Sequence, residues 1–338
     1  MTRQPFVFAA VAVGAALIAL GPIADGDVYW HLAAGREMWH RGALLRTDPF
    51  TLSAAGRPWI DVHWLFQLAV AGVHGAFGLV GLAVAKALTV AAGATLATRA
   101  AERGGGPFAR DTCAVAALAL LFLARHLLPI RPILVTLLCL AAFLLVLEAI
   151  RVGVYRTAAL VSLPLLQLIW VNCQGLAPLG PALVACYLIG ALAASPATPD
   201  RAVARPLALT LAACLVVSFA TPYGLAAVSL PARLLGRITP RGTNIFSTAV
   251  AENIPPLVLG RTSPEMTAHL RAVLIVLAAA LALVRPPLPL AHVLALTGFG
   301  VLALMANRNV LLFYWMLAPV AAIGLAPAAA RRLARLRL

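Results

Sequence analysis

Two carboxylates separated by one glycine, Asp25-Gly26-Asp27, follow directly after the first long apolar segment of the chain. A carboxylate at the edge of a bilayer loses water on one side, which raises its affinity for a proton. Such a group can act as a general base, and a pair can bind a divalent cation such as Mg²⁺ or Mn²⁺. Asp27 can instead cap the amphipathic helix expected over residues 28–39, and one Asp can serve both purposes.

Basic side chains at the ends of other apolar segments are candidates for binding phosphate. Arg125 and Arg131 flank a short turn, and Arg308 lies between two asparagines. A guanidinium binds phosphate through two parallel hydrogen bonds, which makes Arg the preferred residue for this task. His63 is a further candidate for phosphate or metal. The alternative for each arginine is that it extends along a helix end to the lipid headgroups.

The composition limits which elements can position these residues. Of the 338 residues, 62% are hydrophobic and 11% are charged, whereas soluble domains are roughly 45–50% apolar and about 25% charged. A water-soluble enzyme and a disordered chain are therefore excluded. The net charge of +15 comes almost entirely from arginines scattered between apolar segments, so a nucleic acid partner is not expected.

Apolar segments of about 20 residues are long enough to cross a bilayer as helices. They predict one all-α, polytopic membrane domain over residues 1–338 with about ten crossings and no soluble domain. The segments are 6–23, 79–98, 112–127, 132–150, 157–173, 176–195, 206–221, 268–285, 287–305 and 309–327. Both termini would then be cytoplasmic, together with the arginine-containing loops 99–111, 151–156 and 199–205.

Two outer loops of useful length result from this topology, 24–77 and 221–267. The apolar stretch 62–77 within the first loop leaves an alternative, because a crossing there would move every later loop to the other side. The arginine-rich loops would then face outward, against the positive-inside rule. We therefore expect 62–77 to lie along the membrane surface as an interfacial helix.

An acidic pair directly after the first transmembrane helix, followed by an amphipathic outer helix, resembles the GT-C superfamily of integral membrane glycosyltransferases. The similarity is greatest to a bacterial branch of GT-C-like proteins. It is more distant to lipid A aminoarabinose transferases, protein O-mannosyltransferases and the catalytic subunit of oligosaccharyltransferase. Short motifs match that branch in order along nearly the whole chain: 42–51, 56–59, 131–132, 170–175, 221–224 and 307–310.

The resemblance implies an inverting transfer of a sugar from a polyprenyl-phosphate donor to a glycan, lipid or protein acceptor. The reaction would take place on the outer face of a bacterial inner membrane. The resemblance makes Asp27 the first choice for the base and Asp25 the second. Some members need a divalent metal, which this acidic pair would hold. The candidates for binding the donor phosphate are Arg131, Arg125, Arg308 and His63.

Gln174 departs from the pattern of this family. Related enzymes often have Lys or His there, and a Gln side chain cannot neutralise a phosphate. Either other arginines replace it or activity is lost. The alternative functions are a non-catalytic GT-C-like scaffold and a lipid-linked sugar transporter or flippase, although the inverted repeats typical of transporters are not visible in the sequence.

Overall fold

The computed structural model describes residues 3–23, 25–154, 157–194, 199–238, 249–283 and 288–336, and these residues form helices and no strand. The α-helices are α1 (Arg3–Ala19), α2 (Asp27–Arg41), α3 (Trp64–Leu123), α4 (Ile133–Arg151), α5 (Thr157–Cys173), α6 (Leu179–Ala193), α7 (Pro199–Ala202), α8 (Ala204–Val217), α9 (Gly224–Ile238), α11 (Pro256–Leu259), α12 (Pro264–Leu283), α13 (Leu290–Met305) and α14 (Val310–Leu336). The short 3₁₀ helices are η1 (Arg125–Leu127), η2 (Ala251–Asn253) and η3 (Asn307–Asn309). The prediction of an all-helical protein is confirmed for this part of the chain.

Two glycines divide α3 into three helical pieces. Gly78 has φ 62° and ψ −158°, and Gly106 has φ 75° and ψ −165°. Only glycine adopts this region of backbone space without strain, so the chain changes direction at both positions. The first piece, Trp64 to Phe77, is therefore separate from the long helix that follows, as expected for 62–77. The expected connecting loop 99–111 is largely helical, because helix continues to Gly105 and resumes at Pro107, and its cytoplasmic location stays a prediction.

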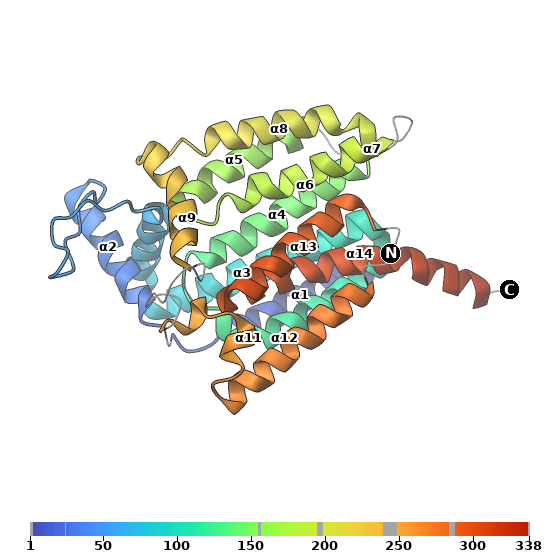
Figure 1. Ribbon diagram of the computed structural model, residues 1–338, viewed down its shortest axis with the longest axis horizontal. Helices are drawn as coiled ribbons and strands as arrows, with labels where there is room; N and C mark the ends of the chain where they lie inside the picture. Colours follow the sequence, from blue (N-terminus) through green and yellow to red (C-terminus); the bar gives the residue numbers. More distant parts are fainter. Residues whose placement is uncertain are drawn as a thin grey trace.

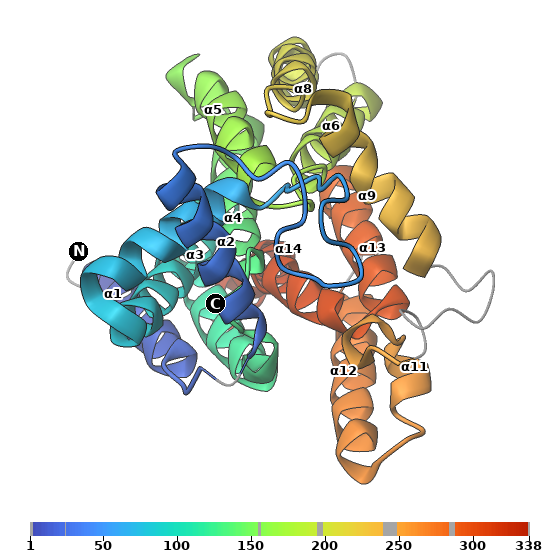
Figure 2. The ribbon, with the colours of Figure 1, turned by 90° about the vertical axis from the view of Figure 1, so that its left-hand side faces the viewer.

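The longer helices lie side by side along the long axis of the molecule, and both termini lie at the same end of this bundle (Figure 1). The opposite end carries α2, α9 and the segment 42–63, which pass across the ends of the bundle helices (Figure 2). We call it the α2 end, and it also contains η1, η2 and η3. The second long loop, 221–267, is not irregular throughout, since α9 and α11 lie within it.

Three helices of the described chain are long and apolar enough to cross a membrane: α3, α4 and the segment Asn307–Pro327. Shorter apolar helices accompany them, among them Gln4–Ala19, Leu179–Ala193 and Leu290–Met305. Within the described part of the chain, helices thus lie in each of the ten apolar segments expected from the sequence, with ends that differ by several residues. Composition and helix length together indicate a membrane protein, and the number of crossings stays a prediction.

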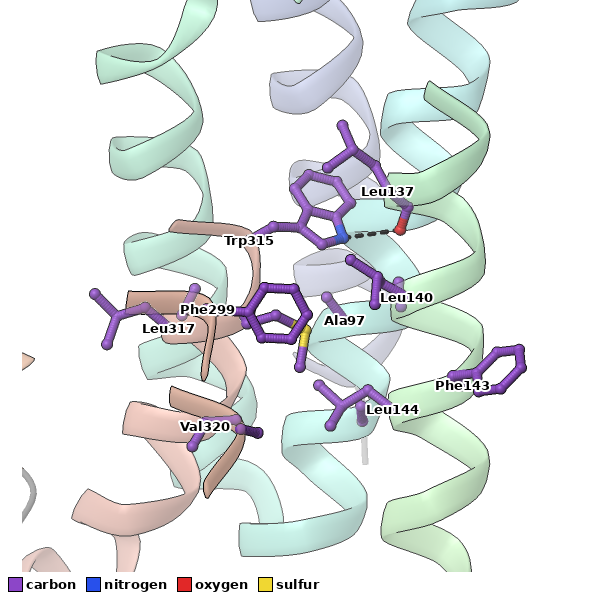
Figure 3. Close-up of a cluster of buried hydrophobic side chains, with 14 of the residues drawn as sticks. Ala97, Leu137, Leu140, Phe143, Leu144, Phe299, Trp315, Leu317 and Val320 are labelled. Atoms are coloured by element: carbon purple, nitrogen blue, oxygen red, sulfur yellow. Dashed lines mark hydrogen bonds between the residues drawn. The ribbon is translucent and has the colours of Figure 1, made fainter. Parts of the chain in front are cut away.

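The packed interior centres on α14, which contacts α3, α4, α12 and α13. Trp315 of α14 is buried, and its indole Nε1 donates to the carbonyl oxygen of Leu137 in α4 at 2.9 Å (Figure 3). Gly93 in α3 makes room for this ring, because a Cβ atom there would lie 2.7 Å from it. Large and small side chains interlock in this way along the bundle, which holds the α2 end in place.

Candidate functional site

Arg131 binds three carboxylates at the α2 end. Its Nε and Nη2 atoms donate to the two carboxylate oxygens of Asp25 at 2.7 and 2.8 Å. Nη2 also lies 2.9 Å from Oδ2 of Asp27, and Nη1 donates to both oxygens of Glu252 at 2.6 and 2.7 Å. The cluster, which we call the Arg131 cluster, joins the α1–α2 linker and η2 to the segment just before α4. It sets three negative charges against one guanidinium.

The chain itself explains why these residues meet. Asp25 is in the short linker that leads from the end of α1 to the start of α2, so it lies at the α2 end of the bundle. Arg131 immediately precedes Pro132, the N-cap residue of α4, and a proline without an N–H is well tolerated at a helix start. Arg131 is thereby fixed at the same end of the bundle, within reach of the linker.

The two aspartates have different environments. The side chain of Asp25 is 19% exposed, and its hydrogen bonds to Arg131 lower its pKa below the ordinary value. Its Oδ1 also accepts the backbone N–H of Asp27 at 3.3 Å. The side chain of Asp27 is 60% exposed and contacts Arg131 through one oxygen. Asp25 is therefore held as an ion pair, and Asp27 is the more accessible carboxylate.

The alternative role of Asp27 as an N-cap is wrong. Helix α2 begins at Asp27 itself, and its N-cap residue is Gly26, which makes no side-chain capping hydrogen bond. The Asp27 carboxylate still lies in the first helical turn, where the helix dipole favours a negative charge. The side chain of Asp27 contacts Arg131 and solvent, so its carboxylate is not used for helix capping and is accessible to a substrate.

The acidic pair does not have the arrangement of a metal site. Arg131 donates to both oxygens of Asp25 and to one oxygen of Asp27, and so takes the place between the carboxylates that a cation would need. Within the described residues, no group of three or more His, Cys, Asp or Glu side chains is arranged to hold a metal ion. The residues present therefore do not fit Mg²⁺ or Mn²⁺ in this state.

The structure separates the arginines proposed for phosphate binding. Arg308 in η3 is exposed and interacts electrostatically with both Glu252 and Arg131. Arg125 is exposed and makes local contacts: its Nη1 donates to the carbonyl oxygen of Phe122 at 2.8 Å, and its guanidinium lies 4.2 Å from the ring centre of Phe122. Arg131 and Arg308 thus belong to one site, and the contacts of Arg125 are those of a residue at a helix end.

His63 lies in a second polar group beside the Arg131 cluster. Its Nε2 is 3.0 Å from Oε1 of Gln174, which also accepts the backbone N–H of Gly175 at 2.7 Å. Burial lowers the pKa of His63, so the imidazole is neutral at pH 7. A neutral His63 paired with Gln174 links the first loop to the α5–α6 turn. Gln174 therefore has a structural contact with the first loop.

Asp61 is a buried carboxylate that no sequence motif singled out. Its side chain is 1% exposed, and Oδ1 accepts the backbone N–H of His63 and Nε2 of Gln67, both at 3.1 Å. Burial raises the pKa of Asp61 to about 6. Oδ2 of Asp61 has no hydrogen-bond partner among the described residues. Asp61 comes just before an apolar helix. From the sequence this position predicts a polar residue at a helix start, but it does not predict that the residue is buried.

His31 connects the two polar groups. It is buried on the inner face of α2, with its ring 5.8 Å from that of His63 and 5.3 Å from that of Phe66. Burial is the main cause that lowers the pKa of His31 to about 3, and the charge of Arg131 acts in the same direction. His31 therefore contributes a neutral imidazole behind Asp25.

An aromatic group lies on α2 and the following segment, one helical turn beyond Asp27. The ring centre of Trp30 is 5.0 Å from that of Phe50 and 5.8 Å from that of Trp59. Asp48 orders the segment, because its Oδ1 accepts the backbone N–H groups of Phe50 and Thr51 at 2.8 and 3.1 Å. This gives the α2 end a partly exposed aromatic surface next to the acidic pair.

A further ionic group lies near the other end of the bundle. Glu148 of α4 is fully buried and binds Nη2 of Arg151 at 2.7 Å and Nε2 of His292 at 2.6 Å, and it accepts a hydrogen bond from the hydroxyl of Tyr187. These contacts tie α4, α6 and α13 together. Lys86 of α3 is also buried.

Comparison with known proteins adds no relative. No protein-family model, curated protein or solved structure matches this chain.

Proposed function

We propose that this protein is a membrane glycosyltransferase of the GT-C type that transfers a sugar from a polyprenyl-phosphate donor to an acceptor hydroxyl. The observation that carries the proposal is the meeting of Asp25, Asp27 and Arg131 at one end of an apolar helical bundle. Two carboxylates and a guanidinium supply the base and the anion-binding group that such a transfer needs. The resemblance of the acidic pair and its flanking segments to GT-C proteins supports the same function.

In the proposed topology the bundle crosses a bacterial inner membrane about ten times and both termini are cytoplasmic. The α2 end then faces outward, with 64–77 lying in the membrane surface. The break at Gly78 supports this placement, since it separates that piece from the long helix that follows. Donor and acceptor meet at the α2 end, where the acceptor can be a glycan, a lipid or a protein.

Asp27 is the base in the proposed mechanism. It takes the proton from the acceptor hydroxyl as the acceptor oxygen forms a bond to the anomeric carbon of the donor sugar. The bond from that carbon to the donor phosphate oxygen breaks, and its electron pair leaves with the polyprenyl phosphate. Attack from the side opposite the leaving group inverts the configuration. Arg131 positions Asp27, and no step needs a metal.

The competing proposal is a non-catalytic GT-C-like scaffold or a carrier of lipid-linked sugars. The neutral Gln174 favours it, because this residue pairs with His63 and brings no positive charge to a phosphate. Such a protein would keep the fold and the lipid-facing surfaces but would need no accessible base. The two proposals therefore differ in what the exposed carboxylate of Asp27 does.

The substitution Asp27→Asn separates them. It removes the negative charge and the proton affinity but keeps the size of the side chain. We expect the transfer rate in proteoliposomes carrying a polyprenyl-phosphate sugar to fall by about 10²–10⁴-fold, the usual contribution of a general base. Thermal stability should change little, because the contact of Asp27 with Arg131 is largely exposed.

Glu37→Gln is the matched control. Glu37 is an acid on the same helix whose partner is Arg41, at 2.5 Å, rather than Arg131. Its substitution should leave transfer unchanged. Full activity in both Asp27→Asn and Asp25→Asn would refute the proposed glycosyl transfer and leave the non-catalytic scaffold.

A further inference from the structure

Glu252 is a site residue that the sequence did not reveal. It lies in η2, and the neighbouring Ile254 accepts the backbone N–H of Asn307 at 3.1 Å, which joins η2 to η3. Both carboxylate oxygens of Glu252 contact Nη1 of Arg131, at 2.6 and 2.7 Å. Arg308 of η3 interacts electrostatically with the same carboxylate. Glu252 is thus ion-paired with Arg131, and its charge also acts on Arg308 of the neighbouring η3.

The placement of Glu252 matters because the rest of the guanidinium is already engaged. Nε and Nη2 of Arg131 face Asp25 and Asp27, so Nη1 is the side from which another anion would approach. That side holds Glu252, whose side chain is 38% exposed. A partly exposed carboxylate on a short 3₁₀ helix can turn out to solvent at small cost, since exposed ion pairs contribute little.

The charges of this site also allow a phosphodiester to take the place of the Glu252 carboxylate. Without Glu252, the two aspartates and the two arginines of this site balance. The carboxylate of Glu252 adds one negative charge, as a phosphodiester would. Phosphate oxygens match the guanidinium fork as well as carboxylate oxygens do. A phosphodiester can therefore replace Glu252 without changing the charge of the site.

We propose that Arg131 and Arg308 form a binding site for a phosphate group, and that Glu252 occupies this site until a phosphate displaces it. This inference rests on the proposed function in one respect, that the phosphate belongs to a lipid-linked sugar donor. Glu252 keeps two arginines from binding other anions while no donor is present. It also couples arrival of the donor to release of η2 from Arg131.

The test is direct binding by the full-length protein in uncharged lipid nanodiscs. The probes are inorganic phosphate and, separately, phosphatidylcholine vesicles containing polyprenyl phosphate. Glu252→Gln removes the competing charge, so we expect it to bind the polyprenyl phosphate about tenfold more tightly than wild type at low salt. Arg308→Gln should bind more weakly than wild type.

Two further variants make the result specific. Glu265→Gln changes another exposed glutamate, in the first turn of α12, and should bind as wild type does. Glu252→Asp keeps the charge on a shorter side chain and should return the affinity toward the wild-type value. This second variant also distinguishes loss of charge from loss of local folding.

Each outcome decides something. Unchanged or weaker binding of both probes by Glu252→Gln would overturn the proposal. Tighter binding of inorganic phosphate alone would support the anion site but overturn its assignment to a lipid-linked donor. Because the assay measures binding without transfer, a positive result beside a fully active Asp27→Asn would keep the phosphate site and reject the glycosyltransferase.

Discussion

Removal of the Arg131 side chain tests whether the Arg131 cluster holds the α2 end together. Arg131→Gln would leave Asp25, Asp27 and Glu252 close together without their shared cation. The hydrogen bonds to Asp25 should dominate the loss, because both partners are less than a quarter exposed. Hydrogen bonds to charged groups contribute about 1.5–3 kcal/mol, whereas exposed ion pairs such as those of Asp27 and Glu252 contribute about 0–1 kcal/mol each.

We therefore expect Arg131→Gln to lower the free energy of unfolding by about 2–4 kcal/mol at pH 7. The measurement is thermal and denaturant unfolding of the purified protein in detergent. Arg125→Gln is the matched control, because Arg125 is exposed and contacts Phe122 of the same helix end. Its effect should stay within about 0.5 kcal/mol, as is usual for surface positions.

The pH dependence gives a second readout of the same change. The pKa of Asp25 is lowered in the folded protein by its hydrogen bonds to Arg131. Its stabilising contribution is therefore present above the unfolded pKa of about 3.9 and is lost as the pH falls through the lower folded value. The difference between wild type and Arg131→Gln should shrink below about pH 4.

A double-mutant cycle completes this test. Asp25→Asn in the Arg131→Gln background removes one of the uncompensated charges, so it should cost less there than in wild type, or even stabilise the protein. Equal stability of Arg131→Gln, Arg125→Gln and wild type would show that the cluster contributes nothing. Packing of the bundle alone would then hold the α2 end in place.

Two other predictions concern Asp61 and the topology. The pKa of Asp61 is raised to about 6 by burial, so its contribution to stability is fully present below about pH 4 and lost as the pH rises through 6. The free energy of unfolding of Asp61→Asn should therefore rise by about 2 kcal/mol relative to that of wild type between pH 4 and pH 7, as measured by thermal unfolding. A constant difference between the two proteins across this pH range would contradict the prediction. In a cysteine-free background, a membrane-impermeant thiol reagent applied outside should label Ser53→Cys and not Arg103→Cys, both at exposed positions. Labelling of Arg103→Cys from outside would make 62–77 a true crossing.

The sequence by itself was enough to predict an all-helical membrane protein and the approximate positions of its helices. Apolar runs of about 20 residues leave little alternative to helices, because the backbone must satisfy its own hydrogen bonds in lipid. The break at Gly78 could also be predicted from the sequence, because the composition changes between 62–77 and the longer apolar run that follows. The acidic pair was recognisable because it directly follows α1.

The tertiary structure alone decided which charges meet. Asp25 and Glu252 lie 227 positions apart in numbering, yet both bind Arg131, and no local pattern signals a contact between loops that far apart. It also separated Arg125 from Arg131, although they are six residues apart, because η1 turns the chain between them. Local spacing fixes neighbours on one helix, whereas the ends of different helices are brought together only by packing of the whole bundle.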